Sequence, residues 1–258
     1  MANSFTLRHM PMQVVLLSGT IPPNAEAYLN GQFVLKEPIK IRSLSARLEI
    51  EYIRAKPRND VRSMVAHFQQ FLHSYKVTEG WSSEDRYIVF VSFMEDGKKV
   101  AEQLGLGFYH ANSKKHPIRM EERRGSTVNG SKGNRKGLVA TTALAAAMTI
   151  HMSGCCATLE SFDMVTFVQQ SGRVGRDGKA AVSLVIPKAQ ASGDADDGLG
   201  DLCGRTAMQK YTHPSVETRS YPEGCLRSVM GEFLDGRGDT CHDFGMDTRL
   251  CCICSEGE

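Results

Sequence analysis

The sequence has neither a long hydrophobic run nor a strong excess of charge of one sign. Its 258 residues carry 31 Lys and Arg against 29 Asp and Glu, which gives a formal net charge of only +2. The longest apolar stretches, such as residues 137–150, are shorter than the roughly 20 residues that a membrane helix needs. We therefore expect no membrane partner, and any surface for nucleic acid must be a local basic patch.

The N-terminal residues also lack the features of a secretory signal. Residues 1–5 (MANSF) do not open a basic segment followed by a hydrophobic run, so we expect an intracellular protein. In a reducing compartment the eight cysteines are expected to be thiols or metal ligands rather than disulfides. With 41% hydrophobic and 23% charged residues, the composition suits a soluble globular protein of one or two domains.

What the sequence does contain is an alternation of strand and helix patterns. Short apolar or alternating runs predict strands at residues 14–17, 48–53, 87–93, 137–141 and 181–186. Apolar residues at helical spacing predict one helix that Asp60 caps and that continues to Tyr75, and a second helix over residues 94–104. Strands separated by helices predict an α/β fold with a mostly parallel sheet and helices on both faces.

Two polar stretches interrupt this order, and no internal repeat is evident. Residues 123–136 are rich in Gly, Ser, Asn, Lys and Arg, which predicts an exposed basic loop. Residues 189–204 are acidic and Gly-rich, which predicts a linker between two units.

The stretch with the clearest chemistry is residues 169–178, which read QQSGRVGRDG. Arg173 and Arg176 are three residues apart and are separated by glycine. A guanidinium offers a fork of donors that stays charged at physiological pH, and glycine lets the backbone approach an anion closely. The stretch therefore predicts a polyphosphate site, although a solvated basic turn is the ordinary alternative for a lone pair of arginines.

Residues 169–178 resemble the sixth signature motif of superfamily 2 helicases in the form that the RecQ family carries. Four other segments are similar to motifs of the same family: residues 17–23 (LSGTIPP) to the third, 88–92 (IVFVS) to the fourth, 109–111 (YHA) to a characteristic strand end, and 138–142 (LVATT) to the fifth. Residues 225–227 (CLR) and 232–236 (EFLDG) resemble the zinc subdomain of RecQ-like helicases, especially the fungal type. The resemblance extends from about Leu16 to Cys254.

The resemblance implies a fold, an activity and a set of cofactors. It implies the end of a first RecA-like domain over residues 1–35, a second RecA-like domain over 36–190, and a linker with a small zinc-binding subdomain over 191–258. The family activity is ATP-dependent 3′ to 5′ unwinding of DNA, single-stranded or junction-containing, with ATP, Mg²⁺ and Zn²⁺ as cofactors. The implied setting is the nucleus, in DNA repair and recombination.

The family also gives roles to the residues of the arginine motif. Its sixth motif reaches the phosphates of an ATP bound on the other RecA-like domain, where an arginine stabilises the charge that develops during phosphoryl transfer. By resemblance, Arg176 is the arginine finger, Arg173 contacts the γ-phosphate or the other domain, and Gln169 positions them. Gly172 belongs to the same nucleotide-binding group.

Two parts of the family pattern are missing. The sequence contains no G-x-x-x-x-G-K-[ST] phosphate loop, since its nearest string, residues 125–132, reverses the final pair, and it contains no Asp-Glu-x-His magnesium motif. Residues 143–148 (ALAAAM) replace the glycine-bearing continuation of the fifth motif, and alanine favours helix where glycine would permit a close approach to phosphate. We therefore expect the ATP-binding half to be missing and catalysis by this chain alone to be impaired.

Four cysteines near the C-terminus predict a zinc site. Cys225, Cys241, Cys251 and Cys254 supply four thiolates, and the last two have the C-x-x-C spacing that lets two sulfurs meet one tetrahedral ion. Cys252 and His242 leave the ligand assignment open, and a set of free thiols is the alternative. Cys155, Cys156 and Cys203 lack such spacing and are expected to be plain core or surface thiols.

Candidate DNA contacts are basic residues of the polar stretches. Lys132, Arg135 and Lys136 in the basic loop, and residues 114–116 before it, could contact the DNA backbone, because phosphate binding requires cations without base-specific geometry. Thr141 in the fifth-motif segment joins them by resemblance. A solvated charged face is the alternative for each cation. Two other functions remain open: a non-catalytic nucleic-acid-binding or regulatory module that pairs with a separate ATPase half, and a decayed helicase remnant.

Overall fold

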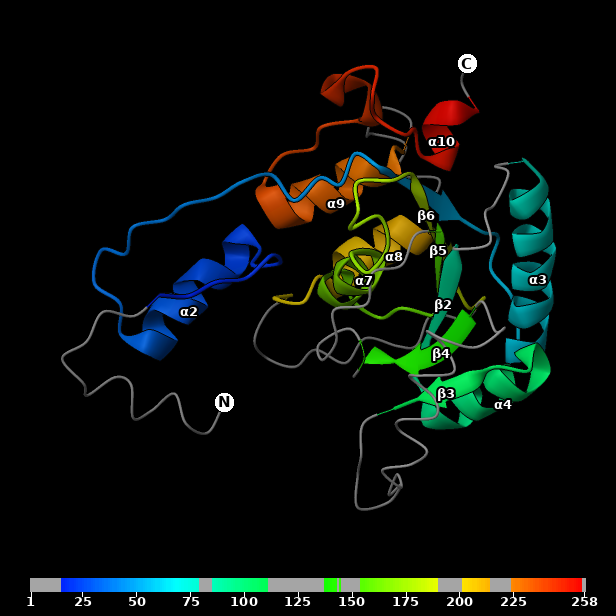
Figure 1. Ribbon diagram of the computed structural model, residues 1–258. Coiled ribbons are helices and arrows are strands. Elements are labelled where there is room, and N and C mark those ends of the chain that lie inside the picture. The colour runs from blue at the N-terminus through cyan, green and yellow to red at the C-terminus, as the bar shows by residue number, and fades with distance from the viewer. Residues whose placement is uncertain are drawn as a thin grey trace.

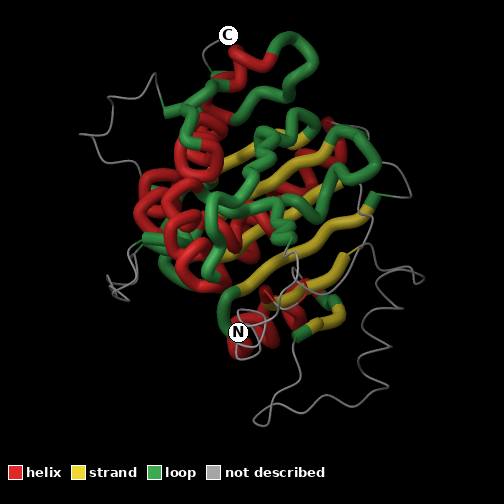
Figure 2. The backbone as a smooth tube through the Cα atoms, turned by 90° about the vertical axis from the view of Figure 1, so that its left-hand side faces the viewer, coloured by secondary structure: helices red, strands yellow, loops and turns green. Residues whose placement is uncertain are grey.

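The computed structural model describes residues 15–78, 85–110, 137–142, 144, 154–189, 201–213 and 224–256. At its centre is a six-stranded, entirely parallel sheet with the strand order β1-β6-β5-β2-β4-β3. The strands are β1 (Ile50–Arg54), β2 (Arg86–Val91), β3 (Gly107–Tyr109), β4 (Gly137–Thr141), β5 (Gly154–Leu159) and β6 (Ala181–Ile186). Figure 2 shows them running side by side across the molecule.

Helices cover both faces of the sheet (Figure 1). One face carries α3 (Val61–Thr78) and α4 (Met94–Leu104), and the other carries α7 (Met164–Ser171), α8 (Arg205–Thr212) and α9 (Leu226–Asp235). The shorter elements are η1 (Pro23–Ala25), α2 (Glu26–Phe33), η3 (Cys241–Phe244) and α10 (Cys252–Ser255). The predicted α/β class with a parallel sheet between two helical layers is confirmed. None of the described helices combines the length and the apolar character needed to cross a membrane.

The two-sided burial follows from the pleat of the strands. Successive side chains of a strand point to opposite faces, so Ile88 and Phe90 of β2 pack under α7, while Val89 and Val91 pack under α3 and α4. All four are almost completely buried, because β2 lies inside the sheet between β5 and β4. A continuous apolar run is what a strand covered on both faces requires.

Most elements fall where the sequence patterns place them. The predicted helix over residues 94–104 and the strands at 137–141 and 181–186 are confirmed, and Asp60 caps α3 by accepting a hydrogen bond from the Ser63 amide at 2.9 Å. Strand β5 was not predicted, and its cysteines at positions 155 and 156 are core thiols whose pKa values burial raises.

The strand expected at residues 14–17 is wrong for the part that the structure describes. Residues 15–17 form no strand, and Val15 and Leu17 are 68% and 90% exposed. An apolar run becomes a buried strand only where neighbouring strands pair with it, and residues 15–17 pair with no strand of the described sheet.

The C-terminal residues pack directly on the sheet. Helices α9 and α10 both contact β1, and Cys225, Leu226 and Met230 share one apolar cluster with Ile50 and Tyr52 of that strand. The division of the chain at residues 35 and 190 stays a prediction. Most of the predicted linker and all of the predicted basic loop at 123–136 lie outside the described residues.

Candidate arginine loop and metal centre

Helix α7 fixes the point from which the arginine loop, residues 172–178, departs. Asp163 caps the helix by accepting a hydrogen bond from the Thr166 amide at 2.7 Å. At the other end of α7, the buried Gln170 accepts a hydrogen bond from the Thr158 hydroxyl at 3.1 Å, and the Ser171 hydroxyl lies 2.7 Å from that of Ser183. These contacts to β5 and β6 hold the last turn of α7 rigidly on the sheet.

The loop itself turns around one buried side chain. Val174 is completely buried, and its carbonyl accepts a hydrogen bond from Arg47 Nη2 at 3.2 Å. Gly175 and Gly178 have φ angles of 66° and 75°, a left-handed conformation that glycine adopts without the steric cost of a Cβ atom. The anchored valine leaves Arg173 and Arg176 on either side of it.

The two arginines are close enough to influence each other. Burial lowers the pKa of Arg173, and the positive charge of Arg176 lowers it further. Arg176 is exposed and folds back so that its Nε donates to the Gly172 carbonyl at 2.9 Å. A bound anion would relieve the repulsion between the two guanidinium groups, so their charge favours an anion such as phosphate.

Gln169 joins the arginine loop to the segment that resembles the third helicase motif. Its Nε2 donates to the Thr20 hydroxyl at 3.1 Å, although 149 positions separate the two residues. Asn24 just beyond this segment donates to the Asp201 carbonyl at 3.0 Å. Sequence reasoning placed Gln169 in the site but missed its contact with Thr20, and it missed the contact of Arg47 with Val174. Nothing local in the sequence pairs these residues.

Thr141, the one predicted DNA contact that the structure describes, does not lie beside the arginines. Thr141 is the last residue of β4, whereas the arginine loop leads into the first residue of β6, so in a parallel sheet the two lie at opposite ends of the strands. Thr141 is nearly buried. Lys132, Arg135, Lys136 and residues 114–116 lie outside the described residues, and their role stays a prediction.

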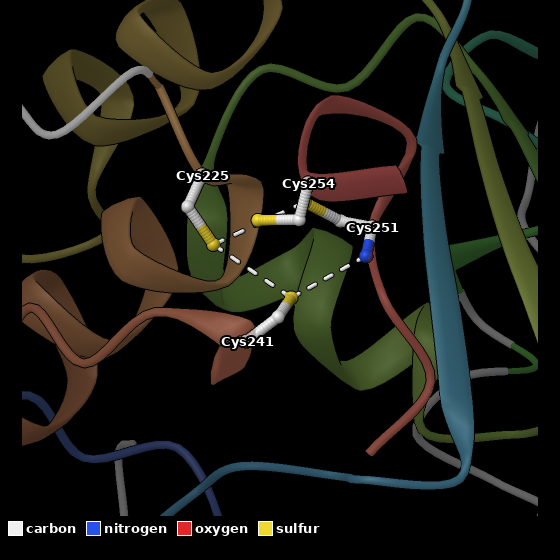
Figure 3. A group of neighbouring side chains, drawn as sticks. All are labelled: Cys225, Cys241, Cys251 and Cys254. Atoms are coloured by element: carbon white, nitrogen blue, oxygen red, sulfur yellow. Dashed lines mark hydrogen bonds between the residues drawn. The ribbon is translucent and has the colours of Figure 1, made fainter. Parts of the chain in front are cut away.

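The four predicted cysteine ligands come together from three separate elements (Figure 3). Cys225 precedes α9, Cys241 opens η3, and Cys251 and Cys254 flank the start of α10. Their four Sγ atoms all lie within 4.8 Å of one another, with 3.7 Å from Cys225 to Cys241 and 3.9 Å from Cys225 to Cys251. Four sulfurs bound tetrahedrally at about 2.3 Å from zinc would be about 3.8 Å apart, so the cluster fits the ion.

The thiols of this cluster contact one another. Contacts with the thiols of Cys225 and Cys241 hold the pKa of Cys251 well below its ordinary value, and thiol contacts raise the pKa of Cys225. The Cys251 amide also donates to Cys241 Sγ at 3.3 Å. A thiolate is the metal-binding form of cysteine, so the donor set has the chemistry that zinc requires.

The structure places Cys254, and neither Cys252 nor His242, with the other three sulfurs. Cys252 Sγ accepts a hydrogen bond from the Arg54 amide at 3.5 Å and so is directed at β1. His242 is exposed.

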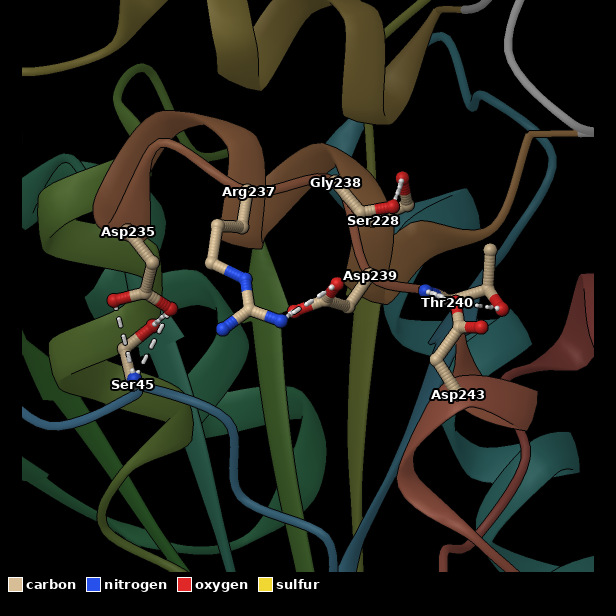
Figure 4. Close-up of polar contacts among 8 residues, drawn as sticks. All are labelled: Ser45, Ser228, Asp235, Arg237, Gly238, Asp239, Thr240 and Asp243. Carbon is tan, nitrogen blue, oxygen red and sulfur yellow. Dashed lines mark hydrogen bonds and ion pairs between the residues drawn. The ribbon is translucent and has the colours of Figure 1, made fainter.

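Polar contacts hold the loop that carries Cys241 (Figure 4). The Asp235 carboxylate accepts hydrogen bonds from the amide and hydroxyl of Ser45, and the Ser228 hydroxyl donates to the Gly238 carbonyl at 2.7 Å. Thr240 and Asp243 form a capping box around the start of η3, in which the Thr240 amide donates to Asp243 at 2.7 Å and lowers the pKa of that carboxyl. Cys241 therefore enters the cluster from a fixed turn.

Comparisons with known proteins identify the fold but not a family. No protein-family model matches the chain, and no curated protein matches it. Among solved structures, Dbp5 of S. cerevisiae bound to RNA and ADP BeF3 matches with a TM-score of 0.56 and 17% sequence identity, over 81% of this chain and 52% of that chain. E. coli DEAD-box protein SrmB bound to regulator of ribonuclease activity A matches with a TM-score of 0.40 and 20% identity, over 61% of this chain and 84% of that one.

The chain thus spans about half the length of Dbp5. Its fold is a RecA-like α/β fold, similar over 81% of the chain to that of Dbp5.

Proposed function

We propose that the chain supplies the arginine-bearing, second RecA-like half of a RecQ-type helicase that unwinds DNA 3′ to 5′ at the expense of ATP. The observation that carries this proposal is the contact between Gln169 and Thr20, which joins two helicase-like motifs at a rigid loop bearing Arg173 and Arg176. In this assignment Arg176 is the finger, Arg173 contacts the γ-phosphate or the other domain, and Gly172 lets the phosphates approach.

ATP must then be held by a phosphate loop that lies outside these 258 residues, since the sequence contains none. Exposed apolar side chains in the N-terminal segment offer such a half a surface to pack against. Ile39 and Ile41 are 92% and 94% exposed, whereas Lys40 and Arg42 between and beside them both bind Glu26. The exposed side chains of Ile39, Ile41 and Leu17 support docking of a separate ATPase half.

DNA is the proposed substrate because the arginine motif and the cysteine segment resemble those of RecQ-type helicases. Single-stranded or junction DNA, the nucleus, and repair or recombination follow from that resemblance. RNA is the nucleic acid in the Dbp5 structure, so RNA is the competing substrate class in any test.

Zinc is the proposed occupant of the four-cysteine cluster, with ATP and Mg²⁺ as the cofactors of the assembled motor. Zinc bound by four thiolates supplies a structural cross-link and leaves no open position for catalysis. Cys225, Cys241, Cys251 and Cys254 would thereby tie α9, η3 and α10 together.

A second function is favoured by one specific feature. Residues 143–148 lack the glycines of the fifth helicase motif, so the chain could bind nucleic acid or regulate an ATPase without supporting turnover. A decayed remnant would do neither.

Complementation of ATP hydrolysis tests the proposal. Alone, the purified chain should hydrolyse no ATP above background. Mixed with the first RecA-like domain of a RecQ-type helicase, it should support DNA-stimulated turnover. Arg176→Ala should then reduce that turnover by at least about 100-fold, because arginine fingers contribute roughly 10³ to 10⁵ in rate.

Arg62→Ala is the matched control, since Arg62 is exposed on α3, on the opposite face of the sheet from α7. Turnover by the chain alone that Arg176→Ala abolishes would contradict the need for a second half. Nucleic-acid binding without any stimulated turnover would favour the binding module, and stimulation by RNA but not DNA would change the substrate class.

A further inference from the structure

One arginine on the helix that follows Cys225 is almost completely buried. Arg227 lies in the first turn of α9, two residues after Cys225, and only 2% of it is exposed. Its guanidinium packs over the ring of Tyr52, with 5.1 Å from the carbon of the group to the ring centroid. A charge removed from water to this extent requires compensation from nearby groups.

The compensation visible around Arg227 is incomplete. Nη1 donates to the Arg47 carbonyl at 2.8 Å, and Nη2 donates to the carbonyls of Ile50 at 2.9 Å and Arg249 at 3.0 Å. Among the described residues, Nε has no hydrogen-bond partner and no carboxylate pairs with the group. The two carboxylates that flank Ile50 in the chain are paired elsewhere: Glu49 with Arg47, and Glu51 with Arg249.

The cysteine cluster has an excess of negative charge once it holds a metal. A divalent ion with four thiolates carries a net charge of minus two, and three of its four cysteines are buried. A buried anion of that size is costly unless a cation lies near it. The chain thus places a buried cation, without a carboxylate partner among the described residues, on the helix that follows one ligand of a site that becomes a buried anion.

The hydrogen bonds of Arg227 also connect the segments that carry the ligands. The side chain starts from α9, which Cys225 precedes, and reaches the carbonyl of Arg249, two residues before Cys251. The same guanidinium binds both segments to the start of β1 through the carbonyls of Arg47 and Ile50. The planar fork of a guanidinium, with its several fixed donors, suits such a bridge between three carbonyls.

We propose that Arg227 is the positioning residue and counter-charge of the four-cysteine metal centre. It holds the Cys225 and Cys251 segments in register and offsets the charge of the thiolates. The inference rests on the metal centre proposed above, and it assigns to Arg227 a role that zinc ligation alone does not require.

Cobalt binding to the full chain tests it. Co²⁺ in a tetrahedral site of four thiolates gives intense visible and near-ultraviolet bands, and competition with a chromophoric chelator gives the dissociation constant. Arg227→Gln, which removes the charge and the fork, should weaken Co²⁺ and Zn²⁺ binding by about 10- to 100-fold, the usual cost of losing an outer-shell partner. Arg227→Lys keeps the charge and loses the fork, so its affinity should lie between those of the Gln variant and the wild type.

Arg237→Gln is the matched control, because Arg237 is exposed on the neighbouring loop and pairs only at the surface with Asp239. It should bind Co²⁺ within about threefold of the wild type. The Tm of each variant, measured with and without metal, separates positioning from plain packing. A packing role alone would lower both Tm values equally and leave the dissociation constant unchanged.

The outcomes distinguish the two proposals. A wild-type protein without the four-thiolate spectrum would overturn the metal centre and the role of Arg227 together. A wild-type spectrum combined with undiminished affinity in folded Arg227→Gln would overturn the role of Arg227 alone. If Arg227→Gln does not fold, undiminished affinity in Arg227→Lys has the same meaning.

Discussion

Gly175 and Gly178 give the arginine loop its turn, but they do so under different constraints. Both have positive φ angles, which cost an alanine about 1–2 kcal/mol. At Gly175 an added Cβ would also lie 3.0 Å from Glu49 Cγ, whereas at Gly178 it would meet open space. The backbone conformation of these two glycines therefore helps to fix the position of Arg176, which lies between them.

We predict that Gly175→Ala lowers the free energy of unfolding by about 2 kcal/mol and that Gly178→Ala lowers it by about 1 kcal/mol. The smaller value is the cost of the left-handed conformation for alanine, reduced by the stabilisation that comes from the lower conformational entropy of the unfolded alanine variant. The larger value includes the close contact with Glu49 as well. Urea unfolding of the two variants measures the difference. Equal losses would show that Glu49 moves aside without cost.

At the scale of helices and strands, the sequence predicts those elements whose ends and periodicity are set by residues close together in the chain. Asp60 marks the start of α3 because a carboxylate that accepts from the amide three residues on is a local cap. Helix α4 follows from its amphipathic period and from Gly105, which ends it in a left-handed conformation. Strands β2, β4 and β6 are apolar runs short enough to be strands.

The misses at this scale come from interactions between distant segments. Strand β5 contains Cys155, Cys156 and Ala157, which carry no β-branched signal, and its place between β6 and β2 makes it a strand. Residues 15–17 have the signal but lack neighbouring strands. Likewise the four cysteines were predictable from their spacing, but the contact of Gln169 with Thr20 was not, because both partners are far apart in sequence.

The metal centre gives a prediction at the scale of elements. The purified protein should carry about one zinc per chain, and chelation should unfold α9, η3 and α10 while the sheet persists. Structural zinc contributes roughly 10–16 kcal/mol of apparent binding energy in zinc-finger peptides, and here that energy would hold three short elements together.

Metal analysis and hydrogen exchange at residues 224–256 measure these two effects. Cys225→Ser should abolish the zinc content, and Cys252→Ser, whose sulfur faces Arg54, serves as the matched control. Absence of zinc together with unchanged stability of Cys225→Ser would refute the site.

For the whole molecule, the near balance of charge restricts how nucleic acid can bind. A net charge of +2 creates no field that would hold DNA over the entire surface. Thr141 and the arginine loop lie at opposite ends of the parallel strands, so a nucleic-acid surface near β4 and a nucleotide site near α7 would be separate. Binding must then depend on a few local cations.

The predicted basic loop supplies such cations, so the salt dependence of DNA binding tests it. Each phosphate that a cation neutralises contributes about one unit to the slope of log K against log salt concentration. Changing Lys132, Arg135 and Lys136 together to Ala should therefore make the slope for single-stranded DNA shallower by about two to three units, with little dependence on base sequence. Fluorescence anisotropy at several salt concentrations measures the slope.

The control replaces Arg62, Lys98 and Lys99, three exposed cations of α3 and α4, and removes the same charge without changing the loop. A slope that the loop variant leaves unchanged would assign the loop to a solvated surface. A slope that both variants change equally would have the same meaning, because the effect would then come from the total charge and not from contacts between the loop and phosphates.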